Sequence, residues 1–416
     1  MKILYISSVP SPKEFYRIKN TVRNNVNVAT YGMNESGFKF HTLIQQGLAI
    51  DNDLSVVSLV GRSVSAKTHR CLIWKTITEY NGDNIKYKHL GFINIFGLKQ
   101  LILSVRFFNN TISWLYKYRD TKDKYIIADA AYVTAIPVVI LAKKIMHCQM
   151  VAIFCDVYEY MGNVKDARET NKVGLLHRYF RWLMAKTYKN LDGFILLTEN
   201  MNNVVNVFDK PHLIIEGLVD VNMTSSINDF KEKSLMDVVM YAGALREQYG
   251  LKSLIDGFMH YHNENARLWV YGAGDYAQAI TNASEQDSRI EFYGLVDNYV
   301  VVKKEIEATL LINPRSTDRE FTKYSFPSKN MEYMVSGTPV LTTRLSGMPA
   351  EYYDYIYPIE GNDAQHITSA LKTVFSQDRL ILHRMGKKAK QFVLENKNNI
   401  VQVQKIIKLL RGLNDD

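Results

Sequence analysis

The feature that most constrains the fold is an alternation of short apolar runs with longer helical patterns. The apolar runs of the first half lie at 54–60, 125–129, 150–156 and 193–198. Runs this short and this continuously apolar are typical of parallel strands buried on both faces. Helical periodicity falls between them, at 96–118, 131–146 and 174–190. The alternation predicts an α/β fold with a doubly wound sheet and right-handed crossovers.

A second domain of the same kind is predicted after Lys210-Pro211. The chain has 416 residues, enough for two domains of ordinary size. Residues 221–236 are polar and turn-rich, which indicates a linker or flexible loop. Residues 237–258 then predict a strand, a glycine loop and a helix. The expected domains are therefore 1–212 and 213–394.

The run from Tyr324 to Thr343 predicts a loop, a short helix and a buried strand. Pro327 suits the first turn of a helix, where its missing N–H needs no partner. Ser325 and Ser328 can offer hydroxyls to the free amides, and Gly337 can provide a left-handed stop.

The start of this helix has the chemistry of a nucleotide site. Free amides and the helix dipole favour a phosphate there, and Lys329 adds a full positive charge. Ser328, Lys329 and Glu332 share one face, so the carboxylate can hold a ribose diol while the amides hold a diphosphate. The alternative is a surface helix with an incidental Lys–Glu pair.

The run resembles the donor-binding motif of the group 1 glycosyltransferases, retaining enzymes with the GT-B fold. The second of two family glutamates aligns with Glu332, and the small-x-Gly-x-Pro-Val ending aligns with 336–340. Tyr324 stands where the family has its first glutamate, which is associated with the donor sugar. Phe326 begins a Phe-Pro-Ser-Lys motif that resembles a bacterial cell-surface polysaccharide branch with the same departure.

The resemblance implies two Rossmann-like domains facing across a cleft, with the nucleotide-sugar on the second. It also implies that the last helix, about 395–416, packs back on the first domain. Gly243 ends a strand at the cleft, and Arg246 and Lys252 can direct cations at a diphosphate, although the family's two cation positions are here Ala244 and Tyr249. Further donor-side positions are expected at Gly272, Gly294 and Val296.

The acceptor side is expected on the first domain, at the carboxyl ends of its strands. Asp129 and Asp156 occupy such ends, and each can instead cap the next helix. We expect Asp156 to orient the acceptor, with Glu159 in the loop that follows it. Gly37 is the only plausible match to a family Gly-Gly pair near the donor phosphates.

Composition limits the setting and the partners. The net charge is +9 with a pI near 9.1, which favours anionic partners. The three cysteines lack CxxC spacing, so a cytoplasmic location is the simpler inference. No transmembrane helix or secretory core is predicted. Two basic helices with aromatic residues, 96–118 and 175–190, are consistent with peripheral contact at the inner face of a membrane, or simply with helices packed on the sheet.

The expected function is retaining transfer of a sugar from a nucleoside diphosphate sugar to a lipid-linked glycan acceptor, in cell-surface polysaccharide assembly such as capsule, exopolysaccharide or lipopolysaccharide. The cation roles are filled by Arg and Lys and no cluster has metal-ligand spacing, so no cofactor or metal is expected. The alternatives are a non-catalytic nucleotide-sugar-binding partner of a transferase complex and a GT-B nucleotide-sugar epimerase. Nucleic-acid binding is not expected, because the lysines are scattered.

Overall fold

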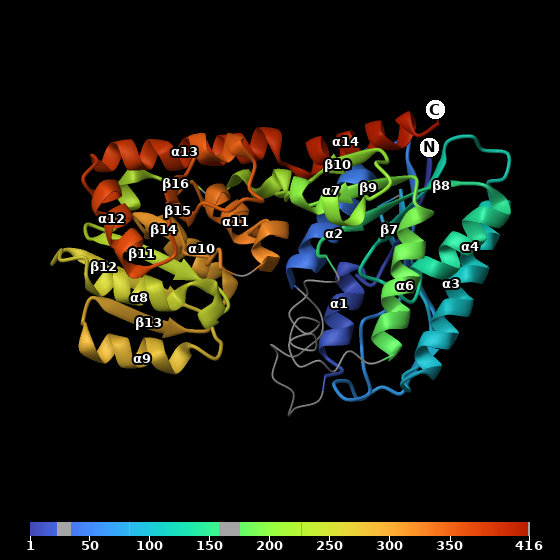
Figure 1. The fold of residues 1–416 in the computed structure, drawn as a ribbon, viewed down its shortest axis with the longest axis horizontal. Helices are drawn as coiled ribbons and strands as arrows, with labels where there is room; N and C mark the ends of the chain where they lie inside the picture. Colours follow the sequence, from blue (N-terminus) through green and yellow to red (C-terminus); the bar gives the residue numbers. More distant parts are fainter. Residues whose placement is uncertain (23–34, 83, 158–174, 226, 319, 415–416) are drawn as a thin grey trace. The chain divides into compact units, whose positions relative to one another are not determined.

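The computed structural model describes residues 1–22, 35–82, 84–157, 175–225, 227–318 and 320–414 (Figure 1). The chain forms two compact units, Met1–Glu216 with Asn399–Asp416, and Gly217–Asn398. The unit boundaries thus lie at 216/217 and 398/399. The boundaries expected from the sequence were 212/213 and 394/395. Both units are mixed α/β, as the alternation of patterns predicts.

The first unit is built on an eight-stranded sheet of order β10-β9-β8-β7-β1-β2-β5-β4. Its strands are β1 (Lys2–Ser7), β2 (Ser55–Val60), β4 (Ile77–Asn81), β5 (Ile85–His89), β7 (Lys124–Asp129), β8 (Gln149–Phe154), β9 (Gly193–Leu196) and β10 (His212–Ile214). All pairs are parallel except β4 with β5, an antiparallel edge that the sequence patterns did not indicate. Short strands β3 (Ile73–Trp74) and β6 (Phe92–Ile93) pair antiparallel beside it.

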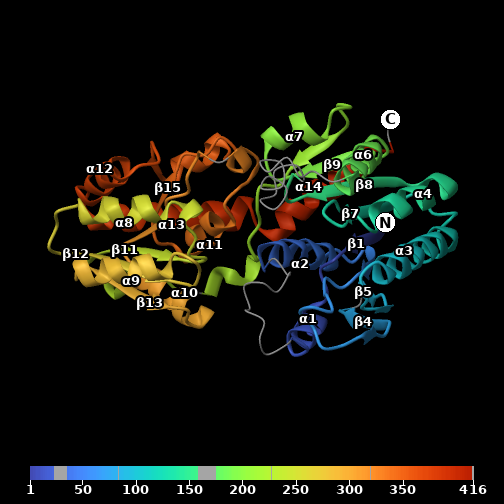
Figure 2. The same cartoon turned by 60° about the horizontal axis from the view of Figure 1, so that its bottom comes forward.

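Helices cover both faces of this sheet. They are α1 (Pro12–Lys19), α2 (Glu35–Ile50), α3 (Leu98–Lys117), α4 (Ile136–Met146), α6 (Leu175–Lys189), α7 (Glu199–Val205) and α14 (Asn399–Gly412). Helices α3, α4 and α6 pack in a row, as Figure 2 shows, and α14 packs on α2. The predicted strands and helices of the first half are confirmed to within a few residues.

The second unit is built on a six-stranded parallel sheet of order β13-β12-β11-β14-β15-β16. Its strands are β11 (Asp237–Ala242), β12 (Ala266–Tyr271), β13 (Ile290–Gly294), β14 (Leu310–Asn313), β15 (Val340–Thr343) and β16 (Tyr357–Ile359). Its helices are α8 (Leu251–Met259), α9 (Ala277–Gln286), α10 (Asn298–Glu307), α11 (Ser328–Ser336), α12 (Ala364–Phe375) and α13 (Arg379–Asn396). Single 3-10 turns are η3 (Val221–Ser225), η4 (Phe230–Glu232), η5 (Glu247–Tyr249), η6 (Glu320–Tyr324) and η7 (Ala350–Asp354).

Two hydrophobic cores lie on opposite faces of this second sheet. Helices α8, α9 and α12 close one core over residues such as Val239, Leu268 and Leu310. Helices α11 and α13 close the other over residues such as Met240 and Leu311. Alternate residues of β11 therefore enter different cores, which explains why the strand is apolar from Val238 to Ala242.

The C-terminal part of the chain forms two helices, and the second of them, α14, belongs to the first unit as expected for the last helix. Helix α13 ends at Asn396 and α14 begins at Asn399. The Val219 amide donates to the Lys397 carbonyl at 3.0 Å, and Val219 forms a parallel bridge with Asn398. Because this short pairing draws the backbone out of the helix, α13 belongs to the second unit and α14 to the first. Among the described residues, no helix has the length and apolar character needed to cross a membrane.

Candidate functional site

The candidate site lies at the carboxyl edge of the second sheet, where the strand order reverses. The chain runs from β11 outward to β12 and β13, returns to β14 on the other side of β11, and continues outward to β15 and β16. This is the doubly wound order in which the crevice beside the first strand receives the ligand. Gly243 follows β11 at this point, and Arg315 follows β14.

Helix α11 begins at this edge of the sheet and is held there by buried polar side chains. The Tyr333 hydroxyl accepts from the Ala242 amide at 2.9 Å and donates to the Ala242 carbonyl at 3.2 Å. Asn330 is fully buried; its Oδ1 accepts from Asn313 Nδ2 at 2.7 Å, and its Nδ2 donates to Thr342 Oγ1 at 3.3 Å. The helix is thereby tied to the ends of β11, β14 and β15. The sequence reasoning missed Asn330 and Tyr333, because their roles appear only once the strands are in place.

The start of α11 differs from the expected cap. Pro327 is the N-cap residue and the helix has no side-chain cap, so neither Ser325 nor Ser328 fills that role. Ser328 is exposed, and the Ser325 hydroxyl is buried with no hydrogen-bond partner in the described part of the chain. At the other end, Gly337 closes the helix with φ 77°, confirming the left-handed stop.

Lys329 extends from the first turn of α11 to the end of β11. Its Nζ donates to the Ala242 carbonyl and lies 4.7 Å from the centroid of the Tyr241 ring. Burial lowers the pKa of Lys329 to about 8; Glu332 opposes this shift and the positive charge of Arg315 adds to it. A cation that is costly to hold in the unliganded protein is suited to an incoming anion.

Arg315 is a second cation at the same point; in the sequence it is a further diphosphate candidate or an ordinary loop charge. Its guanidinium lies 5.1 Å from the centroid of the Tyr249 ring and 5.7 Å from that of Phe321. Stacking on two aromatic rings holds the guanidinium in place. The signal available in the sequence was its position directly after a buried strand that ends in Asn313-Pro314.

Glycines allow the strand-end loops to pack tightly here. A side chain at Gly243, where φ is 150°, would meet Lys329 Nζ at 1.4 Å, so this position leaves room for the ammonium group. A side chain at Gly272 would meet the Gly243 carbonyl oxygen at 1.8 Å. The Gly272 amide donates to the Gly294 carbonyl at 2.8 Å, and the Gly243 amide donates to the Tyr271 carbonyl at 2.9 Å. The ends of β11, β12 and β13 are thereby joined through their backbones.

The other predicted donor-side residues have different surroundings. Arg246 is exposed at the start of η5, on the loop after β11. Lys252 is exposed and donates to Asp256 on its own helix at 2.7 Å, so its charge is already paired. Phe326, which the motif places on the donor side, has its ring buried in the core, 5.1 Å from the Tyr352 ring. Val296 also packs against that core.

Two residues of the family motif remain open to solvent. Glu332 is exposed on α11, three positions after Lys329. Tyr324 ends the 3-10 turn η6 and is half-buried. The carboxylate expected at the ribose is therefore accessible to a ligand, and a phenol stands at the position of the family's sugar-side glutamate.

In the first unit, polar and acidic side chains lie at the carboxyl ends of β7 and β8. Asp129 ends β7; its Oδ1 accepts from the Ala131 amide at 2.9 Å and its Oδ2 lies 3.8 Å from His41 Nε2. His41 Nδ1 lies 2.6 Å from the Tyr5 hydroxyl, and burial lowers the pKa of His41 while Asp129 opposes the shift. Asp129 thus belongs to a buried network and does not cap α4, which begins at Ile136.

Asp156 is exposed just after β8, and Gly37 lies in the first turn of α2. Glu159 lies outside the described residues. Across the described part of the chain, no three His, Cys, Asp or Glu side chains are grouped so that they could hold a metal ion.

Comparison with known proteins finds a family match within the second unit. Residues 236–377 match the family model of glycosyl transferases group 1. No curated protein matches the chain. The matched region contains all of the donor-side residues described above.

Solved structures show the same fold over the whole chain. Sucrose-phosphate synthase from Thermosynechococcus elongatus is 12% identical with a TM-score of 0.64, covering 99% of both chains. HepE of Anabaena, solved in complex with UDP, is 13% identical with a TM-score of 0.62, covering 99% of this chain and 100% of that one. The lipopolysaccharide outer core galactosyltransferase WaaB is 15% identical with a TM-score of 0.58, covering 99% of both. The chain therefore has the GT-B fold of these proteins, and its residues 236–377 match the family model of glycosyl transferases group 1.

Proposed function

We propose that this protein is a retaining glycosyltransferase. It moves a sugar from a nucleoside diphosphate sugar to a lipid-linked glycan in the assembly of a cell-surface polysaccharide. The observation that carries the proposal is the convergence of Gly243, Lys329 and the start of α11 at the point where the second sheet reverses its strand order. The match of this same region to glycosyl transferases group 1 supports it.

In this proposal the donor diphosphate occupies the start of α11. The first amides of the helix donate to its oxygens, and Lys329 and Arg315 provide positive charge. Arg246 joins them from the loop after β11. Glu332 accepts from the ribose hydroxyls, one turn along the helix. Since HepE has been solved with UDP and with UDP-glucose, we propose a uridine donor first.

Glycosyl transfer requires stabilisation of the departing diphosphate. Negative charge develops on its oxygens as the bond to the sugar breaks, and preorganised amides and cations stabilise that charge. In the retaining course that we propose, the leaving phosphate takes the proton of the acceptor hydroxyl, and Asp156 orients the acceptor. The protein's own cations then carry the charge, so we propose transfer without a metal cofactor, which activity retained in EDTA would support.

The cellular setting follows from the same motif. The Phe-Pro-Ser-Lys sequence at 326–329 supports a bacterial polysaccharide role, and the likeness to a lipopolysaccharide galactosyltransferase agrees with that role. The free cysteines Cys71, Cys148 and Cys155 support a cytoplasmic location. Acceptors of this kind are held at the inner face of the cytoplasmic membrane, where the basic helices α3 and α6 can contact it.

Thermal shift against a panel of nucleotide-sugars tests the donor. A matching donor at one hundred times its dissociation constant stabilises the folded protein by about 2.7 kcal/mol, and a sugar nucleotide that does not bind gives no shift. The identified donor is then incubated with lipid-linked acceptors, and release of the nucleoside diphosphate is measured. An absence of stabilisation by every member of the panel contradicts the proposal.

The variant Glu332→Ala tests the ribose contact. Loss of hydrogen bonds to a charged acceptor costs about 1.5–3 kcal/mol, so donor affinity should fall roughly 10- to 100-fold with little change in melting temperature. The matched control is Glu285→Ala, which removes an exposed carboxylate from α9 of the same unit. Equal donor affinity in both variants contradicts the assignment of Glu332.

A non-catalytic nucleotide-sugar-binding partner is the second candidate function. It is favoured by Tyr324 in place of an acid and by the pairing of Lys252 with Asp256. The two functions differ in turnover. A binding partner shows the thermal shift with its donor but releases no nucleoside diphosphate with any acceptor.

A further inference from the structure

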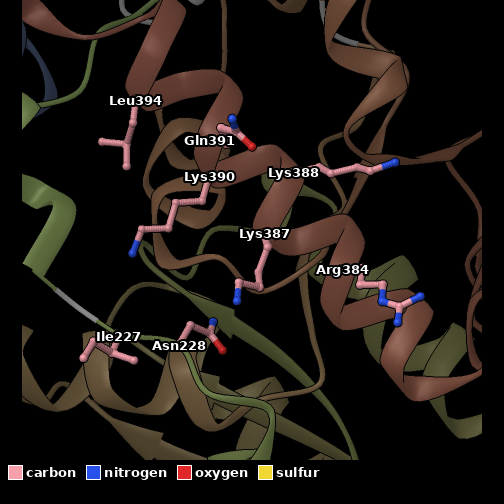
Figure 3. Close-up of a pocket in the computed structure, with 8 residues that line it drawn as sticks. All are labelled: Ile227, Asn228, Arg384, Lys387, Lys388, Lys390, Gln391 and Leu394. Atoms are coloured by element: carbon pink, nitrogen blue, oxygen red, sulfur yellow. The ribbon is translucent and has the colours of Figure 1, made fainter.

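A basic groove lies between α13 and the segment that precedes η4 in the second unit. Figure 3 shows Lys387 and Lys390 extending from α13 toward Asn228, across a cavity of about 580 Å³. The residues that line it are Ile227, Asn228, Arg384, Lys387, Lys388, Lys390, Gln391 and Leu394. Four of these eight side chains are cationic and none is acidic, which is the composition of an anion site.

The segment 227–236 is a fixed part of this surface. Asn228 Nδ2 donates to the Ser336 carbonyl at 2.8 Å and to Thr338 Oγ1 at 3.0 Å. The Phe230 ring lies 5.4 Å from the His383 ring, and Arg379 Nη1 donates to the Leu235 carbonyl at 3.0 Å. The segment, part of the stretch expected as a linker or flexible loop, therefore runs antiparallel to α13 and is held to the second unit by these contacts.

Positive charge accumulates on the two adjoining segments. Residues 227–236 and 379–394 contain seven Lys and Arg, of which Lys233 is buried, against two acids, Asp229 and Glu232. Within the described ranges, no carboxylate lies at ion-pair distance from Lys387 or Lys388. Burial lowers the pKa of Lys390, and the neighbouring Lys387 lowers it further. The cations are close enough to repel one another, so a bound anion would relieve the repulsion.

The same surface exposes large apolar side chains. Leu235 is 95% exposed, Ile227 81% and Ile381 51%. Phe230, Met236 and Leu380 are also exposed on these two segments. Single exposed apolar residues are ordinary, but a group of this kind beside a basic groove marks an interaction surface.

We propose that this face of α13 and segment 227–236 docks on an anionic phospholipid bilayer, with a lipid phosphate in the groove between Lys387 and Lys390. The apolar side chains enter the headgroup region while the lysines meet the phosphates, as in an interfacial amphipathic helix. A protein partner is a poorer fit, because lysine is depleted in the cores of protein interfaces. A water-soluble phosphate is also a poorer fit, because it would make no contact with the exposed leucine and isoleucine side chains.

Asn228 forms part of the wall of the groove and is held in place by buried hydrogen bonds. Asn228 is 7% exposed, and its Oδ1 has no hydrogen-bond partner among the residues described. Its amide nitrogen is committed to Ser336 and Thr338, so the oxygen is oriented by those bonds. Phosphatidylglycerol carries the anionic phosphate that the cations lining this groove can bind.

Vesicle co-sedimentation of the full chain tests the proposal. Vesicles of phosphatidylcholine with phosphatidylglycerol should bind the protein, and vesicles of phosphatidylcholine alone should bind it far more weakly. The double variant Lys387→Gln/Lys388→Gln should lower partitioning about fivefold for each cation, roughly 25-fold in all. The control Lys303→Gln/Lys372→Gln removes two exposed lysines from α10 and α12, which do not line the groove, and should keep wild-type partitioning.

A second variant separates the membrane from a soluble ligand. Leu235→Ser removes a fully exposed side chain, so folding is unaffected, and vesicle partitioning should fall roughly tenfold. Glycerol phosphate is used as the soluble competitor. The proposal is overturned if the two double variants partition alike, if neutral vesicles bind equally well, or if Leu235→Ser binds fully while glycerol phosphate displaces the protein.

Membrane docking through this groove is independent of donor binding at the start of α11. Thermal shift with the donor nucleotide-sugar should be the same in the groove variants as in the wild type. Loss of donor binding in Lys387→Gln/Lys388→Gln would mean that the groove belongs to the donor site and would also overturn the proposal.

Discussion

The sequence identifies Lys329 as a candidate ligand for a phosphate, but it does not show which residues Lys329 contacts in the folded protein. The sequence places a cation in the first turn of a helix, where an acid is normally favourable. The structure adds that its ammonium reaches the Ala242 carbonyl and lies over Tyr241. The pKa of Lys329 depends on these neighbours, which belong to a strand far away in the chain.

Donor binding should depend on pH through Lys329. Its pKa in the folded protein is about 8, and a bound diphosphate favours the protonated form and raises that pKa. The affinity for UDP should therefore be constant below pH 8 and fall above it, by roughly tenfold per pH unit at most. Calorimetric titration of UDP from about pH 7 to about pH 9 measures this dependence.

The matched variant is Lys329→Arg, because arginine stays protonated over this range. Its affinity for UDP should vary less with pH than that of the wild type. Identical pH profiles for the two proteins would contradict the role of Lys329. Protein stability changes in the opposite direction: since the lysine pKa is lowered on folding, this group adds stability as the pH rises from about 8 toward 10.5.

At the scale of elements, the position of helix α11 is determined by its hydrogen bonds to the ends of three strands. Its boundaries follow from sequence signals, with Pro327 before it and Gly337 after it. Its position follows from Tyr333 and Asn330, whose polar groups satisfy the ends of three strands in a buried setting. A helix of nine residues has little stability alone, so these contacts and its core residues keep it in place.

Asn330→Ala should destabilise the second unit. It leaves the buried Asn313 Nδ2 without its acceptor, which costs about 1–3 kcal/mol. Urea unfolding compares it with Asn282→Ala, in which the lost amide is exposed on α9 and bonded only to Gln278. A midpoint for Asn330→Ala equal to that of the control would show that this network does not stabilise α11.

At the scale of the whole molecule, the chain crosses between its units twice. It leaves the first unit after Glu216 and returns to it at Asn399. The returning helix α14 packs on α2 at Gly47, where a side chain would meet the Asn399 carbonyl oxygen at 2.4 Å and Val403 Cγ2 at 2.7 Å. The first and last parts of the sequence are therefore one structural unit.

Gly47→Ala should destabilise the first unit by loosening this contact. Overpacking of a tight helix contact costs about 1–3 kcal/mol, and the clash with a backbone oxygen leaves little room to relax. Scanning calorimetry measures the loss. The control is Gly412→Ala, at the exposed end of α14, where nothing lies near the added methyl and helix propensity favours alanine. Equal melting temperatures for the two variants would contradict the packing role of Gly47.

Three features of the structure could not be predicted from the sequence, each for a physical reason. The β4–β5 edge has an exposed, polar pattern on β4, which does not resemble a buried parallel strand. The break between α13 and α14 depends on pairing with Val219, which is remote in sequence. Arg315 could be noticed but not chosen, because the aromatic rings that hold it come from two other loops.

Local chemistry by itself determined the apolar strands, the glycine stop at 337 and the Lys329–Glu332 face, because each depends on residues close together in the chain. Only the tertiary structure decided which strand ends meet, that Phe326 is buried, that Lys252 is paired, and that segment 227–236 lies along α13. The physical reason is that burial and ion pairing are set by neighbours distant in sequence. Periodicity describes a segment's own faces, whereas the pKa of a lysine and the exposure of a leucine depend on what packs against them.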